Sequence, residues 1–330
     1  MNEHLLKENQ EIFKKLNIPN WHKEGITGKG VNVAILGYGG VMEDKKTYLT
    51  NINPPADGGS YHDGDELINS VAPDAKIYSI NIFTGSWKFE DALRWILKND
   101  IDIVCTSIVK SSWNYELEEL SKQLYEKGAI MVDSSDNVGK KDSIGWPAKS
   151  PYWYAVGAYF KGDKAGYSSY GKELDILGYT DLGVHVKEDH IVPISHTSGT
   201  TQVISGMVAL LKEAYRINNE GFKQYMQENS IDLNTPGWDK ETGWGLFKLE
   251  EKSNIYKLKF PKKEYAQEKE EGESVDDIKF KDIQNHWAKE DIQKVVAAGL
   301  MNGYEDGIFK PDESVTRAEI ATILTRALKL

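Results

Sequence analysis

The sequence predicts an α/β fold, in which a parallel sheet is covered by helices on both faces, followed by a small all-α helix–loop–helix module. Three observations lead to this prediction. Near-continuous apolar runs alternate with helical patterns between residues 31 and 158. A long stretch without Asp, Glu, Lys or Arg follows, from residue 190 to 211. The composition then changes abruptly near residue 252, where apolar periodicity is lost. Strands that are apolar on both sides are typical of a parallel sheet buried between helices.

The first part of the chain alternates strands with helices. Two helical patterns lie between the strands, Glu90–Lys98 and Tyr115–Lys127, and Gly128 ends the second. The predicted strands are Val31–Leu36, Ala75–Phe83, Ile101–Ser107, Ala129–Ser134 and Tyr154–Ala158. The glycines that follow the first strand, in GYGG, do not complete a dinucleotide-binding G-x-G-x-x-G, so no cofactor is predicted.

The uncharged stretch contains HTSGTTQVISG, which opens a helix that is apolar on more than one face. Such a helix is a central, buried one. Ser198 lies just ahead of it, where unpaired backbone N–H groups and the helix dipole favour negative charge. The sequence therefore offers Ser198 as a candidate nucleophile, and an N-cap serine is the alternative interpretation.

Composition excludes several classes of function. The net charge of −11 argues against nucleic acid and anionic membranes as partners. No apolar run approaches the roughly 20 residues of a membrane span. The single cysteine, Cys105, excludes an intrachain disulfide and lies in an apolar run, where we expect a buried core residue. No cluster of metal ligands stands out, and the N-terminus shows no secretory signal.

The charged segment near residue 252 reads as a solvated linker. We therefore divide the chain into a domain of residues 1–250, a linker of residues 251–277 and a module of residues 278–330. In the module we predict a helix over Trp287–Ala297, a turn over Gly303–Gly307, and a final helix opened by a capping box of Thr316 and Glu319.

The first domain resembles the subtilisin-like serine peptidases from about Pro19 to Leu249. WHKEGITGKGVNVAIL is similar to the lead-in to that family's first catalytic strand, and NSVAPDAKIYSINIF to its V-A-P segment. WPAKSPYWYAVGAY and AGYSSYGKELDILGY resemble the stretch before the nucleophile, SHTSGTTQVISG the G-T-S-M-A-x-P-x-V-x-G motif, and GWGLFKLE the closing strand. The resemblance implies a subtilisin-like sheet flanked by helices.

The same resemblance implies the roles of individual residues. The nucleophile position falls on Ser198 and the oxyanion-hole asparagine on Asn137, after Asp136. The substrate-binding edge strand falls on Ser107, Ile108 and Val109, whose last position is normally glycine. The triad aspartate falls on Gly37 and the triad histidine on Asp63. Because the segment from Asp63 to Pro73 is shorter than in the family, we expect the helix of that histidine to be largely missing.

These replacements predict a catalytically impaired pseudopeptidase whose remnant cleft holds a peptide. A serine hydroxyl needs a base of near-neutral pKa, and an aspartate is a much weaker one. Asp136 would oppose an oxyanion, and Val109 would crowd the edge strand. The alternative is an active serine endopeptidase with a non-standard base. His62, His196 or an acidic group from Asp63, Asp65 and Glu66, as in the sedolisins, are the candidates for that base.

The C-terminal module resembles one S-layer homology repeat almost throughout, from FKDIQNHWA through GYEDGIFKP to VTRAEIATILTRAL. The resemblance implies binding to secondary cell-wall polysaccharide and a place on the bacterial cell surface. The implied glycan-binding residues are Trp287, Gly303, Tyr304 and Arg317, with the Arg317 guanidinium as the contact for an acidic sugar. Core packing is the alternative role of Trp287. Because the family usually combines three repeats, a homotrimer is a further hypothesis. Without a visible signal, a mature form, non-classical export and delivery on a phage particle stay open.

Overall fold

The chain divides into two compact units, Met1–Phe260 and Pro261–Leu330. A computed structural model describes residues 3–37, 49–52, 65–83, 87–187 and 190–251 of the first unit. Of the second unit it describes residues 280–284, 286, 288–297, 301, 307–313, 315, 316 and 320.

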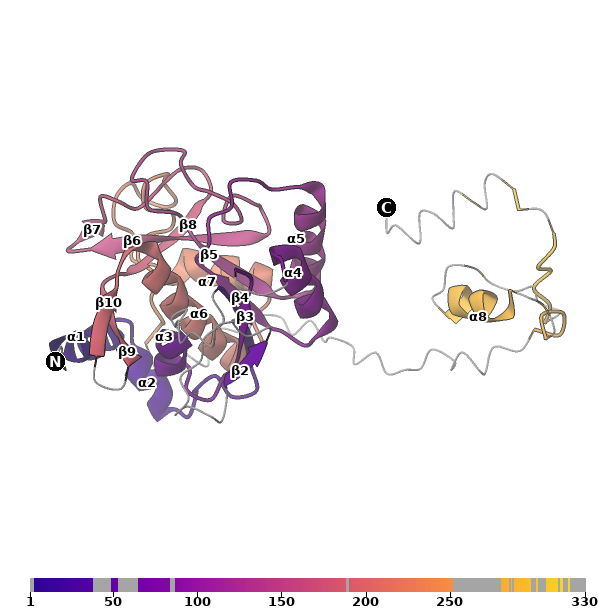
Figure 1. Ribbon diagram of the computed structural model, residues 1–330, viewed down its shortest axis with the longest axis horizontal. Helices are drawn as coiled ribbons and strands as arrows, with labels where there is room; N and C mark the ends of the chain where they lie inside the picture. The colour runs from indigo at the N-terminus through magenta and orange to yellow at the C-terminus, as the bar shows by residue number, and fades with distance from the viewer. Residues whose placement is uncertain are drawn as a thin grey trace. The chain divides into compact units, whose positions relative to one another are not determined.

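The first unit is built on an eight-stranded, mostly parallel sheet (Figure 1). Its strands are β1 (Asn32–Gly37), β2 (Leu49–Ile52), β3 (Lys76–Asn81), β4 (Ile103–Thr106), β5 (Ile130–Ser134), β6 (Trp153–Phe160), β7 (Asp163–Lys164) and β8 (Leu174–Tyr179). The order is β2-β3-β1-β4-β5-β6-β7, with β8 paired to β6. Only the β6–β7 pairing is antiparallel. A separate antiparallel pair is formed by β9 (Leu182–Lys187) and β10 (His190–Ile194).

Helices cover both faces of this sheet because successive strand residues point to opposite sides. On β1, Val33 and Ile35 join one core cluster, whereas Ala34 and Leu36 join another. The second cluster is closed by α4 (Phe89–Lys98) and α5 (Tyr115–Lys127). The first is closed by α1 (Glu3–Lys15), α2 (Ile18–Lys23), α3 (Asp65–Val71), α6 (His196–Tyr215) and α7 (Asn219–Asn229). Figure 1 shows α4 and α5 on one side of the sheet and α6 and α3 on the other.

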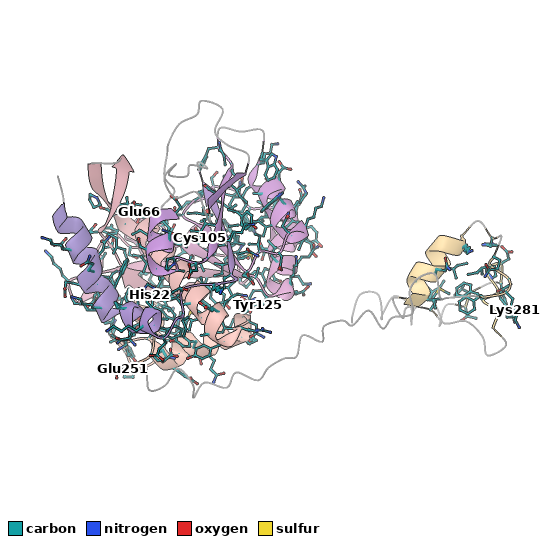
Figure 2. All side chains as sticks on the ribbon, turned by 90° about the horizontal axis from the view of Figure 1, so that it is seen from below. His22, Glu66, Cys105, Tyr125, Glu251 and Lys281 are labelled. Atoms are coloured by element: carbon teal, nitrogen blue, oxygen red, sulfur yellow. The ribbon has the colours of Figure 1, made fainter. Side chains whose placement is uncertain are left out.

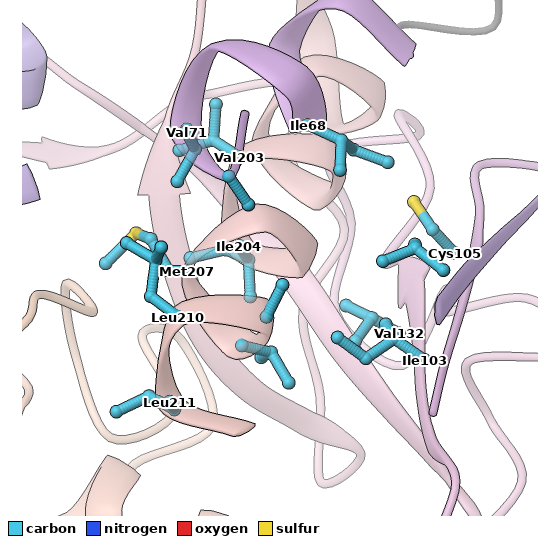
Figure 3. Packing of buried hydrophobic residues seen from close by; sticks show 14 of the residues in the cluster. Ile68, Val71, Ile103, Cys105, Val132, Val203, Ile204, Met207, Leu210 and Leu211 are labelled. Carbon is cyan, nitrogen blue, oxygen red and sulfur yellow. The ribbon is translucent and has the colours of Figure 1, made fainter. Parts of the chain in front are cut away.

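The helix α6 lies at the centre of the larger cluster, and fourteen of its twenty residues are buried. Val203, Ile204 and Met207 belong to this cluster together with Ile103 and Val132 of the sheet (Figure 3). The helix α3 packs against α6 at Gly206, where an added Cβ would lie 2.7 Å from Val71 Cβ. Only a glycine allows the two helices to approach this closely. The predicted central buried helix is therefore present.

Cys105 is a free thiol with 1% exposure, and it lies on β4 inside the first unit (Figure 2). The expectation that it is a core residue agrees with this position. None of the helices in the described part of the chain is long and apolar enough to cross a membrane.

The loop that leads into β1 is anchored by one carboxylate of α6. Oε2 of Glu213 accepts the backbone N–H groups of Thr27, Gly28 and Lys29 at 2.7, 2.6 and 3.1 Å. Thr27 is further held by its hydroxyl, which donates to Asp74 at 2.6 Å. The C-terminal half of α6 thus fixes the chain where it enters the first strand of the sheet.

In the second unit, the described residues include α8 (Lys289–Ala297) and a small apolar core of Ile283, Ile292 and Phe309. The carboxylate of Asp282 accepts the backbone N–H groups of Phe309 and Lys310. Burial works to raise the pKa of Asp282, but these N–H groups outweigh it and leave the pKa below its ordinary value. The predicted start of this helix at Trp287 lies outside the described residues.

Candidate functional site

The candidate site lies at the carboxyl ends of the parallel strands, the edge where open α/β sheets place their ligands. Gly37 is the last residue of β1, and Ser107, Ile108 and Val109 follow directly after β4. Asp136 and Asn137 lie just beyond the end of β5. Ser198, which is half-buried, lies in the first turn of α6. The helix begins two residues before Ser198, not after it as predicted, and its N-cap is Ser195.

Asn137 is bonded directly to the first turn of α6. Its Oδ1 accepts both the backbone N–H and the hydroxyl of Thr197, each at 3.0 Å. The asparagine thereby satisfies one of the free N–H groups of the helix start, which Ser195 does not do through its own side chain. With Oδ1 engaged, Nδ2 is the group of the amide that can donate to an oxyanion. The structure thus brings Asn137 within one residue of Ser198.

The residues that precede these two positions, Asp136 and His196, both have left-handed backbone conformations. Their φ angles are 79° and 70°. This region favours glycine, and glycine is what the subtilisin-like motifs carry at both positions. Aspartate tolerates it better than most residues because its side chain bonds locally, and Asp136 Oδ1 accepts the N–H of Asn137 at 2.6 Å. The backbone at Asp136 and His196 therefore has the conformation typical of glycine, although both residues carry side chains.

Those side chains change the surroundings of Ser198. The ring of His196 is exposed and meets the ring of Tyr167 edge to face, with centroids 4.6 Å apart. The carbonyl of His196 accepts from Thr180 Oγ1 at 3.0 Å, and Thr180 Oγ1 accepts from Tyr167 at 3.0 Å. The imidazole is thus packed on an aromatic ring, and no hydrogen bond joins it to Ser198.

The segment after β4 contains a third departure from the motifs, because Val109 stands where they carry glycine. Val109 is 44% exposed, and its neighbour Lys110 donates its backbone N–H to the carbonyl of Trp146 at 2.8 Å. A Cβ placed on Gly145 would lie 2.5 Å from Val109 Cγ1 and 3.7 Å from Asp136 Oδ2. Val109, Asp136 and Gly145 therefore meet at one point of this edge of the sheet, and Asp136 is next to Asn137 in the chain.

A second carboxylate, Asp133 on β5, lies beneath this region. It is fully buried, and its Oδ2 accepts the N–H of Ala148 at 2.9 Å. Burial raises the pKa of Asp133 well above its ordinary value, and the Ala148 N–H offsets only part of this effect. Sequence reasoning missed Asp133, Gly145 and Thr197. For Asp133, the available sequence signal is a carboxylate inside the apolar run IMVDS.

The positions that correspond to the triad aspartate and histidine are described only in part. Asp63 and His62 lie outside the described residues. Gly37 pairs with Asn81 of β3 and offers no side chain. The expectation that the following helix would be largely missing is wrong, because the seven residues of α3 form two turns that pack on α6. Asp65 and Glu66 begin α3, with exposures of 0% and 7%, and Figure 2 marks Glu66 there.

Within the described residues, no three His, Cys, Asp or Glu side chains lie close enough to hold a metal ion. The candidate glycan-binding residues of the second unit, Trp287, Gly303, Tyr304 and Arg317, all lie outside the described residues.

Comparisons with known proteins match both parts of the chain. Residues 49–245 match the subtilase family, and residues 279–321 match the S-layer homology domain. The minor extracellular protease Epr of Bacillus subtilis is 27% identical over 248 residues, which are 68% of this chain and 38% of that protein. M-protease of Shouchella clausii is 27% identical over 227 residues, 61% of this chain and 59% of the relative. The chain thus spans well under two thirds of the length of these two relatives.

Solved structures give the same fold. Fervidolysin of Fervidobacterium pennivorans, a keratinolytic enzyme related to subtilisin, superposes with a TM-score of 0.59 at 21% identity and covers 68% of this chain and 42% of its own. The prenylagaramide maturation protease PagA superposes with a TM-score of 0.58 at 18% identity. The match covers 70% of this chain and 95% of the PagA chain. At these identities the likeness shows the predicted subtilisin-like α/β fold and nothing about activity.

Proposed function

The chain belongs to the subtilase family, and from this premise we propose that its first unit is a catalytically impaired member that holds a peptide in its cleft. We propose further that the S-layer homology module tethers it to secondary cell-wall polysaccharide. The corresponding division is a peptidase-fold domain of residues 1–250, a linker of residues 251–277 and a module of residues 278–330.

One observation carries the first half of the proposal. Asn137 and Ser198 are held together at the head of α6, whereas the last position of β1 is Gly37. In the family this strand end supplies the aspartate that orients the catalytic histidine. A glycine offers neither a hydrogen bond nor a charge to orient a base. This supports the proposal that Ser198 holds the nucleophile position without its supporting acid.

The expected loss of catalytic rate follows from the need of a serine nucleophile for a base. In this family, loss of the histidine alone costs about 10⁶ in kcat, and roughly 10³–10⁴ over water remains from the oxyanion hole and binding. Among the described residues of the first unit, no hydrogen bond joins Ser198 to a histidine. His22 bonds instead to the carbonyl of Val71, at the far end of α3. Asn137 would supply the residual stabilisation of an oxyanion.

A fluorophosphonate probe tests the proposal, because it labels only a serine that is activated as a nucleophile. We expect labelling of the wild-type chain to stay at the level of Ser198→Ala over hours, while an active subtilisin is labelled under the same conditions. Stoichiometric labelling at Ser198 would refute catalytic impairment.

A second test restores the two replaced positions. In Gly37→Asp with Asp63→His, we expect probe labelling and peptide hydrolysis to rise above the wild-type level if the replaced residues alone limit activity. A rise in the double variant but not in either single variant would match the joint role of acid and base. If the double variant stays inactive, the changes at Val109 and Asp136 also block catalysis.

The second candidate function is an active serine endopeptidase with a carboxylate base. It is favoured by Asp65 and Glu66, two buried carboxylates at the start of α3, the helix that packs against α6. In that case wild type is labelled by the probe, and Asp65→Asn or Glu66→Gln abolishes labelling while the fold stays intact. Either variant would identify the base.

An S-layer homology domain implies association with the cell surface or cell wall, and the wall glycan is its proposed ligand. We expect the full chain to co-sediment with purified cell-wall sacculi that retain their secondary polymer, and Arg317→Ala to weaken this binding. A guanidinium binds an acidic sugar substituent through paired N–H donors, which alanine lacks. Equal sedimentation with sacculi stripped of the polymer would contradict a glycan ligand.

A further inference from the structure

The point where Val109, Asp136 and Gly145 meet is the feature of the cleft that the proposed loss of catalysis leaves unexplained. Val109 Cγ1 and Asp136 Oδ2 lie 2.5 and 3.7 Å from the same point above Gly145. The first is a methyl group of a side chain that is 44% exposed. The second is a carboxylate oxygen of a partly exposed residue. An apolar surface and a negative charge therefore adjoin each other, next to Asn137.

The charge of Asp136 is not balanced by any ion pair within the described part of the chain. Its Oδ1 accepts the N–H of Asn137, and Oδ2 lies 3.7 Å from the position of a Cβ built on Gly145, beside Val109. Lys110 and Lys149, which lie near this edge, interact with aromatic rings instead. Lys110 Nζ lies 5.3 Å from the centre of Phe89, and Lys149 Nζ lies 5.9 Å from that of Trp146.

Asp133, the other carboxylate of this region, does not reach the surface. It is completely buried, and burial raises its pKa well above the ordinary value. The carboxylate exposed at this edge of the sheet is therefore that of Asp136. An anionic ligand group would be repelled there, and a bulky apolar group would leave the carboxylate desolvated.

A long cationic side chain matches both halves of this surface. Lysine and arginine bury their methylene stems on apolar groups while the charged head reaches a polar partner. The isopropyl group of Val109 offers the apolar contact, and the Asp136 carboxylate offers the partner for the head. The chain as a whole carries a net charge of −11, which also attracts basic polypeptides.

We propose that the cleft selects a polypeptide segment that presents a lysine or arginine, with the stem of that side chain on Val109 and its charged head on Asp136. This inference rests on the proposed function, because it assigns a ligand class to the same cleft. It makes Asp136 and Val109 specificity-determining residues, whether or not Ser198 is reactive.

The test compares three fluorescent peptides, Ala-Ala-X-Ala-Ala amides, where X is lysine, norleucine or glutamate. Norleucine has the stem of lysine without its ammonium group, so the comparison isolates the charge. On the full chain we expect the lysine peptide to bind about fivefold more tightly than the norleucine peptide, as a partly exposed ion pair allows. The glutamate peptide binds most weakly. Fluorescence anisotropy at low and high salt measures the three affinities, and the preference shrinks as salt screens the pair.

Asp136→Asn is the decisive variant, because its amide oxygen can still accept the Asn137 N–H. We expect it to bring lysine and norleucine to equal affinity. Glu126→Gln, which removes the same charge from the exposed side of α5, retains the preference. Val109→Gly weakens the lysine and norleucine peptides alike. Equal binding of these two peptides by wild type, an unchanged preference in Asp136→Asn, or no binding of any peptide would each overturn the inference.

An experiment that refutes the proposed loss of catalysis has a different readout from one that refutes this inference. Cleavage of the peptides, read by mass spectrometry, would show that the protein is active and leave the inference standing. The side-chain preference would then be measured in Ser198→Ala.

Discussion

Replacing Glu213 with alanine removes the anchor between α6 and the loop that enters β1. One oxygen, Oε2, accepts three backbone N–H groups, from Thr27, Gly28 and Lys29, at 2.7, 2.6 and 3.1 Å. Gly28 is buried and Thr27 is half-buried, so their N–H groups cannot easily turn to water. Lys29 is exposed, and its N–H is hydrated in the variant.

The magnitude follows from these three bonds. A hydrogen bond to a charged group contributes about 1.5–3 kcal/mol, so the two shielded bonds together give about 3 kcal/mol at the low end of that range. The exposed bond adds little. For a unit of this size, 1 kcal/mol shifts the melting temperature by about 2–4 °C. We therefore expect Glu213→Ala to melt about 6–12 °C below wild type.

Thermal unfolding of the full chain, followed by far-ultraviolet circular dichroism, measures the effect. Glu228→Ala is the matched control, since Glu228 is exposed on α7 and accepts only from Gln224, at 2.8 Å. Glu213→Gln retains an oxygen at the same place and is expected to lose about half as much as Glu213→Ala. A melting temperature for Glu213→Ala within about 2 °C of the control would refute the reasoning, because 1 kcal/mol or less would then be involved.

Four other predictions follow from the structure. Gly206→Ala places a Cβ 2.7 Å from Val71 Cβ, so we expect it to lower the free energy of unfolding in urea by about 1–2 kcal/mol. Gly166→Ala, which has open space around it, should lower it less, and equal losses would contradict the close approach of α3 and α6. Burial raises the pKa of Asp175 to about 7. Its contribution to stability is thus complete below its ordinary pKa near 4 and is lost as the pH rises through 7. Between pH 5 and 8, Asp175→Asn should therefore gain on wild type by about 2–3 kcal/mol, and parallel pH profiles would contradict this. Asn137→Ala leaves the N–H and hydroxyl of Thr197 without their acceptor and should cost about 1–2 kcal/mol in the same assay; no change would mean that α6 starts independently of Asn137. Light scattering on the full chain should give a trimer if single S-layer homology modules associate in threes, and a monodisperse monomer would count against that hypothesis.

Five strands of the sheet, β1, β3, β4, β5 and β6, were predictable because they lie in near-continuous apolar runs. The predicted helix over Tyr115–Lys127 coincides with α5, which Asn114 caps through its side chain and Gly128 ends in the left-handed conformation. The strand boundaries differ by one or two residues, as for Ala75–Phe83 against Lys76–Asn81. The parallel strands β2 and β8 and the antiparallel strands β7, β9 and β10 were not predicted. Polar residues interrupt β2, β7, β8 and β9.

The helix α3 shows why a short segment was misjudged. Because the segment from Asp63 to Pro73 is shorter than in the family, the sequence predicts that its helix is largely missing. Two turns need only seven residues, and Ile68 and Val71 bury their side chains against α6. Packing on a neighbouring helix stabilises a helix that would be too short to form alone.

The candidate site was predictable only as positions along the chain. Asn137 and Ser198 are sixty-one residues apart, and the sequence gives no sign that Thr197 joins them. Likewise, the contact between Val109 and Gly145 depends on two loops from different strands meeting at the same edge. The left-handed φ angles of Asp136 and His196 are invisible in the sequence, where neither residue is a glycine.

The burial of α6 has a consequence for how such proteins evolve. Because fourteen of its twenty residues are buried, the position of Ser198 is determined by the core and not by catalysis. Mutations that remove the acid or the base leave this helix untouched, so natural selection for stability alone preserves the geometry of the serine. A search for serine hydrolases by shape would therefore find this protein whether or not it hydrolyses peptides.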